Sequence, residues 1–165
     1  MKIAITDANI FIDLIKLQWL GYLFCINLEI YTTREVIDEL MVSQLECVTA
    51  FIQSQQLIIY SFSSEELEQI QEMTAPSSLS TPDKSVVFLA RHLDAGILSG
   101  DNPLRKFCLA HKLEVKGIVW LFDQFLEFGL VNHQSAISQM THLLSFNNRL
   151  PLTECHGRLK EWKEK

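Results

Sequence analysis

The stretch GILSGDNPLRKF, residues 96–107, decides the fold, because an apolar run passes directly into a helical segment. The run ends at Ser99 and Gly100, Asp101 follows, and helical character begins after it. An aspartate there is a good N-cap, since its side chain can accept a hydrogen bond from an unpaired backbone N–H of the first turn. Whether Asp101 does more depends on where the other acidic residues lie.

Short apolar runs alternate with amphipathic segments along the chain of 165 residues. The runs predict strands, and the amphipathic segments predict helices. Strands are predicted at 2–6, 28–33, 57–62, 95–99 and 114–118. Helices are predicted at 10–24 with a break near Gly21, after Thr32 or Thr33 through EVIDEL, and at 44–54, 63–73, 80–94 and 102–112. The tail from 119 is predicted as helical, with breaks at Gly129 and at NNRLP. This order predicts β-α-β units and therefore an α/β fold, a parallel sheet with helices on both faces.

Composition favours one ordinary globular domain, with residues 74–82 as an internal loop. The four cysteines form no C-x-x-C pair, which argues against a zinc site built on paired thiolates. Asp7 and Asp13 interrupt the apolar N-terminus, so we expect neither a signal peptide nor a membrane span but a cytoplasmic, soluble protein. The net charge of −6 argues against a broadly basic nucleic-acid-binding surface.

Acidic residues follow two of the predicted strands at the point where each strand ends. Asp7 comes directly after the first strand, and Asp101 follows the fourth after one glycine. Asp83 lies in the first turn of the helix before the fourth strand, and Glu39 lies on the helix after the second strand, one to two turns from its start. The carboxyl ends of parallel strands share one edge, where ligands bind. We therefore expect these four carboxylates to converge there.

Four neighbouring carboxylates repel one another unless cations neutralise them. Oxygen ligands select Mg²⁺ or Mn²⁺, and such ions can activate water for phosphoryl chemistry. Asp101, Asp83 and Glu39 taken singly have structural explanations, namely capping, the helix dipole and solvation. Asp7, at the end of an apolar strand, has no capping role of equal clarity. Asn9 can cap a helix or orient a carboxylate, and Ser99 can be a strand-end hydroxyl or a donor to the site. Only the joint placement favours the metal site.

Other site types lack their sequence signals. The five histidines show no H-E-x-x-H spacing, and neither G-x-G-x-x-G nor G-x-x-x-x-G-K-[ST] occurs. The nucleophile-elbow pattern G-x-S-x-G is also absent. These absences leave the acidic residues as the main candidate site.

The chain resembles the PIN-domain family, and within it the VapC-like ribonucleases of toxin–antitoxin systems. The resemblance rests on ITDANIFIDL (5–14), TTREVIDEL (32–40), STPDKSVVFLARHLDAGILSGDNPLRKF (80–107) and LEVKGIVWLFDQFLEFGLV (113–131). It implies a three-layer α/β/α fold with a five-stranded parallel sheet in the order 3-2-1-4-5. It also implies Mg²⁺- or Mn²⁺-dependent cleavage of RNA by activated water.

The family's four acidic positions match Asp7, Glu39, Asp83 and Asp101. Asn9 matches its accompanying polar position, and Ser99 a position that often holds Thr or Ser. The resemblance implies a PIN-like nuclease domain over 1–131, with 132–165 as a helical extension packed on it. An RNA substrate, an antitoxin protein and a homodimer are the partners that it suggests.

Two other functions stay open from the sequence. A PIN-like module that binds RNA or protein without cutting would fit the acidic net charge and the additional helices, although it needs no set of four carboxylates. A phosphatase on a similar sheet usually has a second aspartate two residues after the first, and here Asn9 occupies that position.

Overall fold

Five short strands pair into one sheet in the computed structural model, which describes residues 1–165. The strands are β1 (Ile3–Thr6), β2 (Glu29–Thr33), β3 (Leu57–Tyr60), β4 (Gly96–Leu98) and β5 (Val115–Lys116). Their order is β3-β2-β1-β4-β5, and every neighbouring pair is parallel. The predicted α/β class and sheet order 3-2-1-4-5 are therefore confirmed.

Strand β1 lies at the centre of the sheet. Ala4 is paired with Ile30 of β2 on one side and with Gly96 of β4 on the other. Ala4 and Ile5 point to opposite faces of the sheet and are both fully buried, which agrees with a parallel sheet covered on both faces. The residue that follows β1 thus emerges in the middle of the carboxyl edge.

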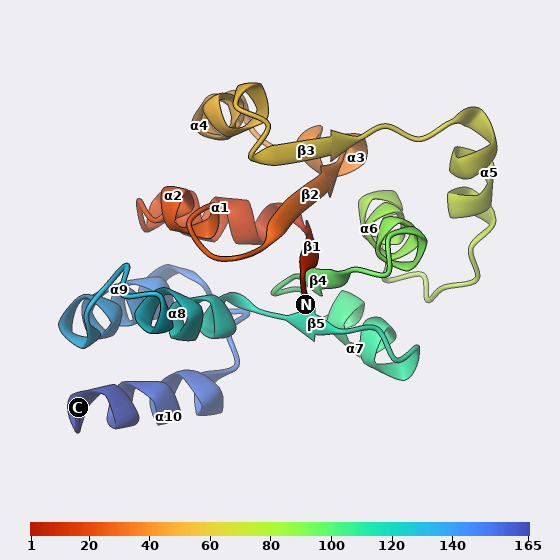
Figure 1. Cartoon of the computed structure of the whole chain (residues 1–165). Helices are drawn as coiled ribbons and strands as arrows, with labels where there is room; N and C mark the ends of the chain where they lie inside the picture. Colours follow the sequence, from red (N-terminus) through yellow and green to blue (C-terminus); the bar gives the residue numbers. More distant parts are fainter.

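Helices cover both faces of the sheet (Figure 1). One layer contains α1 (Ala8–Lys16), α2 (Leu20–Leu23), α4 (Val42–Gln53) and α8 (Ile118–Glu127), and the other contains α5 (Ser64–Glu72), α6 (Thr81–His92) and α7 (Asn102–Ala110). The single turn α3 (Arg34–Ile37) follows β2, and α9 (His133–Phe146) and α10 (Leu152–Lys163) complete the chain beside α8. The three-layer arrangement is as predicted.

The predicted helix starts at serine residues are confirmed. Ser63 and Glu66 form a capping box at α5, and Ser80 and Asp83 form one at α6. In each box the serine hydroxyl accepts a hydrogen bond from a first-turn N–H, and the acidic side chain accepts one from the serine N–H. Local sequence therefore positions the start of α6 at the carboxyl edge.

Two predicted helices are shorter in the structure. The helix predicted over 10–24 is divided at Gln18, whose φ of 58° is left-handed, and not at Gly21, which lies inside α2. Helix α3 ends at Ile37, so Glu39 lies in the turn after it and not on a helix. The N–H groups of Glu39 and Leu40 reach back only three residues, which tightens the chain and buries Leu40.

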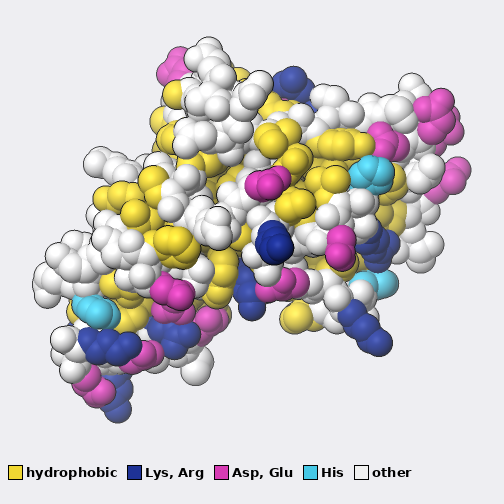
Figure 2. Space-filling model, viewed as in Figure 1, with side chains coloured by type: hydrophobic (Ala, Val, Ile, Leu, Met, Phe, Trp, Pro, Cys, Tyr) yellow, Lys and Arg dark blue, Asp and Glu magenta, His cyan; other side chains and the backbone are white.

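The surface carries its charges unevenly. Figure 2 shows acidic side chains over α5 with no Lys or Arg among them on that face, whereas both signs are interspersed over α10. Glu65, Glu66, Glu68 and Glu72 are the acidic residues of α5. A polyanion would be repelled from the α5 end.

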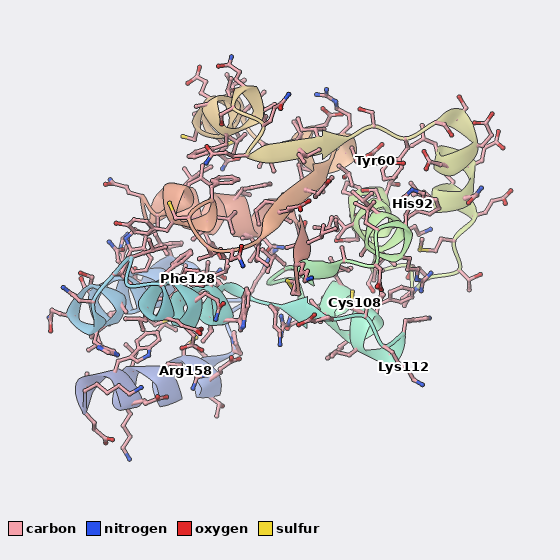
Figure 3. The ribbon with its side chains drawn as sticks, in the orientation of Figure 1. Tyr60, His92, Cys108, Lys112, Phe128 and Arg158 are labelled. Atoms are coloured by element: carbon pink, nitrogen blue, oxygen red, sulfur yellow. The ribbon has the colours of Figure 1, made fainter.

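The last two helices share the hydrophobic core of the sheet-covering helices. Trp162 of α10 is 3 % exposed and stacks on Phe122 of α8 with ring centroids 6.0 Å apart. Arg158 extends from α10 toward α8 (Figure 3), and its Nη2 lies 2.9 Å from Oδ2 of Asp123. A boundary between a nuclease domain and an extension at residues 131 and 132 stays a prediction. No helix has both the length and the apolar character to span a membrane.

Candidate functional site

Asp7 is held in one orientation at the end of β1. It is the N-cap of α1, and its Oδ1 accepts a hydrogen bond of 2.7 Å from the N–H of Ala8. Its Oδ2 accepts from the hydroxyl of Ser99 at 2.7 Å and from the amide of Asn9. The sequence pattern indicates no clear capping role for Asp7, so this cap is a finding of the structure.

Asn9 and Ser99 tie the ends of β1 and β4 together. The side-chain oxygen of Asn9 accepts from the N–H of Gly100 at 2.7 Å, and the Ser99 hydroxyl accepts from the N–H of Asp101 at 3.0 Å. Gly100 allows this approach, because a Cβ there would lie 3.2 Å from the Asn9 oxygen. Of the alternatives for Asn9, the structure contains the contact to a carboxylate, since Asp7 is the helix cap.

Asp83 and Asp101 each use one oxygen to stabilise a helix start. Oδ2 of Asp101 accepts from the N–H of Leu104 at 3.0 Å, and Oδ2 of Asp83 accepts from the N–H and hydroxyl of Ser80 at 2.7 and 2.8 Å. Oδ1 of each aspartate makes no hydrogen bond within the protein. The capping explanation is therefore correct for both residues and leaves each one oxygen for a ligand.

The four predicted carboxylates line one hollow at the carboxyl edge of the sheet. Its lining includes Asp7, Glu39, Asp83 and Asp101, together with Asn9, Ser80 and Arg149. Ser99 lies behind it, fully buried and bonded to Asp7. We call this hollow the carboxylate cavity. The structure thus brings together residues that come from β1, the turn after α3, and the starts of α6 and α7.

Burial and repulsion between neighbouring carboxylates raise the pKa values of two acids in this cavity. Burial raises the pKa of Asp7 to about 6, the hydrogen bond from Ser99 opposes the rise, and the charges of Asp83 and Glu39 add to it. The pKa of Glu39 is also raised, first by desolvation and then by Asp83. A cation placed here would offset this unfavourable concentration of negative charge.

The donor set of the cavity suits a hard divalent cation. Carboxylate, amide and hydroxyl oxygens line it, and no Cys or His is present. No group of three acidic, His or Cys side chains lies close enough to coordinate one metal ion. Asp83 and Asp101 each use one carboxylate oxygen to accept a capping hydrogen bond at the start of a helix. The residues fit Mg²⁺ or Mn²⁺ by their chemistry.

Arg149 is the residue of this cavity that the sequence reasoning missed. It comes from the loop between α9 and α10, and it is the only Lys or Arg in the lining. The NNRLP stretch indicates only a helix break. No local pattern indicates that this break returns to the carboxyl edge.

Comparison with protein families gives one match. A family model described as a PIN domain matches residues 3–164. The match covers the sheet, the carboxylate cavity and both C-terminal helices. No curated protein matches the chain.

Proposed function

The chain belongs to the PIN-domain family, whose fold is of the nuclease type, and from this premise we propose that it is a divalent-metal-dependent endoribonuclease. One observation carries the proposal: Asp7, Glu39, Asp83 and Asp101 line the same cavity at the carboxyl edge of a parallel sheet. Ligand sites of open α/β sheets lie at that edge.

The four carboxylates would hold one or two Mg²⁺ or Mn²⁺ ions. A bound ion of this kind activates water for in-line attack on a phosphodiester and offsets charge on the leaving oxygen. Ser99 and Asn9 donate hydrogen bonds to Asp7 and so fix the direction of its carboxylate. Such supporting donors control how well a ligand is oriented.

RNA must approach a protein whose net charge is −6. The acidic surface of α5 is unsuited to it (Figure 2), so local cations near the carboxylate cavity become important. Arg105 and Lys106 lie on α7 just after Asp101, whereas Nζ of Lys84, next to Asp83 on α6, donates to the carbonyl of Gln71 on α5 at 3.4 Å. We assign the RNA phosphates to this side of the edge.

The finer proposal is that the protein is the toxin of a toxin–antitoxin pair in the cytoplasm. It rests on the VapC-like pattern of the sequence, and an antitoxin protein and a homodimer are the proposed partners. Induced expression should arrest growth, and Asp7→Asn should abolish the arrest. Equal growth of cells expressing either protein, at matched soluble levels, would contradict the toxin role.

Two measurements on the full chain test the nuclease. We expect an anomalous-difference peak beside Asp7 and Asp101 in a crystal soaked in Mn²⁺, at about 2.0–2.3 Å from their oxygens. We also expect cleavage of labelled single-stranded RNA with Mg²⁺ or Mn²⁺, loss of cleavage with EDTA, and loss in Asp7→Asn. Asp94→Asn is the matched control, because Asp94 is exposed and its φ of 49° is one that Asn adopts readily.

A catalytically silent module that binds RNA or protein is the second candidate. The net charge of −6 and the additional helices favour it, and Arg149 adds a cation to the lining of the carboxylate cavity. In that case saturating Mn²⁺ gives no anomalous peak, and Asp7→Asn binds RNA or its protein partner as the unmodified chain does. A peak with metal-dependent cleavage selects the nuclease.

A further inference from the structure

A second cavity adjoins the carboxylate cavity and shares Asn9 and Arg149 with it. Its other walls come from the start of α8, with Gly117 and Trp120, from the loop 147–151, and from α1, α7 and α10, which contribute Asp13, Asn102, Arg105 and Glu154. We call it the adjoining cavity. The C-terminal helices therefore contribute directly to the surroundings of the four carboxylates.

The loop that carries Arg149 is anchored to a buried group. The amide of Asn147 donates to Oδ2 of Asp13 at 2.7 Å, and Asp13 is only 6 % exposed. The side-chain oxygen of Asn147 accepts from the N–H of Arg149 at 2.9 Å, and Leu150 is buried. The backbone at Arg149 is thus fixed although its side chain is exposed.

The guanidinium of Arg149 makes no hydrogen bond and no ion pair inside the protein, and its charge acts only at longer range on Asp13, whose pKa it lowers against the effect of burial. The five ion pairs of the structure lie elsewhere, and the hydrogen bond that Arg149 makes in its loop comes from its backbone N–H. A cation held at the mouth of an acidic cavity, yet paired with none of the acids, is available to an incoming anion. Arginine suits phosphate because its planar fork donates two parallel hydrogen bonds.

A second guanidinium forms the inner wall of the adjoining cavity. Nη1 of Arg105 donates to the carbonyl of Ser99 at 3.1 Å, which places its charge directly behind the end of β4. Gly117 makes room for it, because a Cβ there would lie 3.1 Å from the same nitrogen. Asn102 and Glu154 add an amide and a carboxylate, which can hydrogen bond to base edges or to a ribose 2′-hydroxyl.

We propose that the mouth shared by the two cavities is a phosphate subsite of the RNA site, in which Arg149 binds the phosphate next to the one that is cleaved. The adjoining cavity itself, about 60 Å³, is too small to enclose a nucleotide. The proposal rests on the proposed function, because it takes the cleaved phosphate to lie over the four carboxylates. The guanidinium of Arg149, with Arg105 and Trp120 nearby, suits a ribonucleotide phosphate at this mouth. The carboxylates of Asp13 and Glu154, which also line the adjoining cavity, repel a phosphate from its interior. The C-terminal helices then determine how RNA is positioned.

Binding without cleavage tests this subsite. We would measure the fluorescence anisotropy of a short fluorescein-labelled single-stranded RNA with the full chain in EDTA, over a series of NaCl concentrations. Arg149→Ala should raise Kd about tenfold, and the slope of log K against log salt should fall by about 0.7, the value for one phosphate contact on a single strand. Arg149→Lys should keep the slope and recover only part of the affinity, because an ammonium lacks the planar fork.

Arg91→Ala is the matched control, since Arg91 is exposed on the last turn of α6, which leads into the opposite edge of the sheet. It should bind as the unmodified chain does. Circular dichroism should be equal for all four proteins, and the urea midpoint of Arg149→Ala should fall only slightly, because Arg149 has no ion pair to lose and acts on Asp13 only at longer range.

Three outcomes overturn the subsite: no RNA binding by the unmodified chain, an unchanged Kd in Arg149→Ala, or equal losses in Arg149→Ala and Arg91→Ala. Failure of the nuclease proposal looks different. RNA binding that depends on Arg149, with no cleavage in Mg²⁺ or Mn²⁺, keeps the subsite and removes the nuclease. Metal-dependent cleavage with no effect of Arg149→Ala keeps the nuclease and removes the subsite.

Discussion

Replacing Asp7 with asparagine should change how the stability of the protein depends on pH. Asp7 is 4 % exposed, and burial raises its pKa from the ordinary value of 3.8 to about 6. The folded chain therefore holds this proton more tightly than the unfolded chain does. The protonated carboxyl stabilises the fold fully at pH values below 3.8, and this contribution is lost as the pH rises through about 6.

The size of the effect follows from that pKa. Each tenfold change in proton affinity corresponds to about 1.4 kcal/mol, so ionised Asp7 costs the metal-free fold about 3 kcal/mol at pH values above about 6. Near pH 4 the unfolded chain is already partly ionised at Asp7, so about 0.6 kcal/mol of this cost is present there. The free energy of unfolding should therefore fall by about a further 2 kcal/mol between about pH 4 and about pH 7.5. The asparagine side chain in the Asp7→Asn variant cannot ionise, so the variant lacks this pH-dependent cost entirely.

The assay is urea unfolding in EDTA, with the unmodified chain, Asp7→Asn and Asp94→Asn compared at several pH values. In Asp7→Asn an amide replaces the carboxyl as acceptor for Ser99 and Asn9, which changes the stability relative to the protonated carboxyl by an amount that does not depend on pH. Relative to the unmodified chain, Asp7→Asn should therefore gain about 2 kcal/mol between about pH 4 and about pH 7.5. The buried Asp13, whose pKa is also raised to about 6, is common to all three proteins and cancels.

Metal ions provide the second arm of this experiment. Mg²⁺ at about pH 7.5 should stabilise the unmodified chain more than Asp7→Asn, because a cation that binds only the folded state adds its binding free energy to stability. Stability curves that stay parallel in pH for all three proteins would refute the reasoning about burial. Equal stabilisation of both proteins by Mg²⁺ would refute the assignment of Asp7 as a ligand.

Three further substitutions test the neighbouring contacts and the C-terminal helices. Ser99→Ala removes a hydrogen bond to Asp7, and we expect RNA cleavage to fall about 10- to 100-fold with circular dichroism unchanged. Cleavage at the rate of the unmodified chain would show that Ser99 does not orient the carboxylate. Gly100→Ala forces a Cβ to 3.2 Å from the Asn9 oxygen and should lower the urea midpoint by an amount that corresponds to about 1 kcal/mol. Gly157→Ala is the control and should not lower the midpoint, because a Cβ at this position of α10 would meet no other atom within 4 Å. Trp162→Ala removes the ring that stacks on Phe122 and should lower the free energy of unfolding in urea by about 3–5 kcal/mol. A decrease no larger than that of Lys160→Ala, at an exposed position of α10, would show that α10 does not support the core.

The sheet and the placement of two acids could be predicted because the signals are local. Asp7 and Asp101 each follow a short apolar run, and the carboxyl ends of parallel strands must share an edge. The start of α6, with Asp83, is marked by a capping box and by a proline in the first turn. These features depend on a few neighbouring residues and on sheet geometry.

The remaining features depend on contacts between distant segments. The sequence pattern predicts a helix at Glu39, but burial of Leu40 turns the chain after α3. Gln18 divides the first helix in a left-handed conformation that no glycine marks. Arg149 reaches the carboxylate cavity because Asn147 binds Asp13, a contact between residues 134 positions apart. Helical periodicity in the tail contains no information about that contact.

The hydrogen bond between Asn9 and Gly100 joins residues 91 positions apart, which sets when the site can form during synthesis. A nascent chain that has emerged only as far as α6 contains Asp7 and Asn9, but β1 then has an unpaired side and no β4 to complete it. Contacts of such long sequence separation form late in folding. The four carboxylates can therefore converge only after β4 and Asp101 have emerged, and a nascent chain that ends at α6 carries the acids separately and not as an assembled cavity.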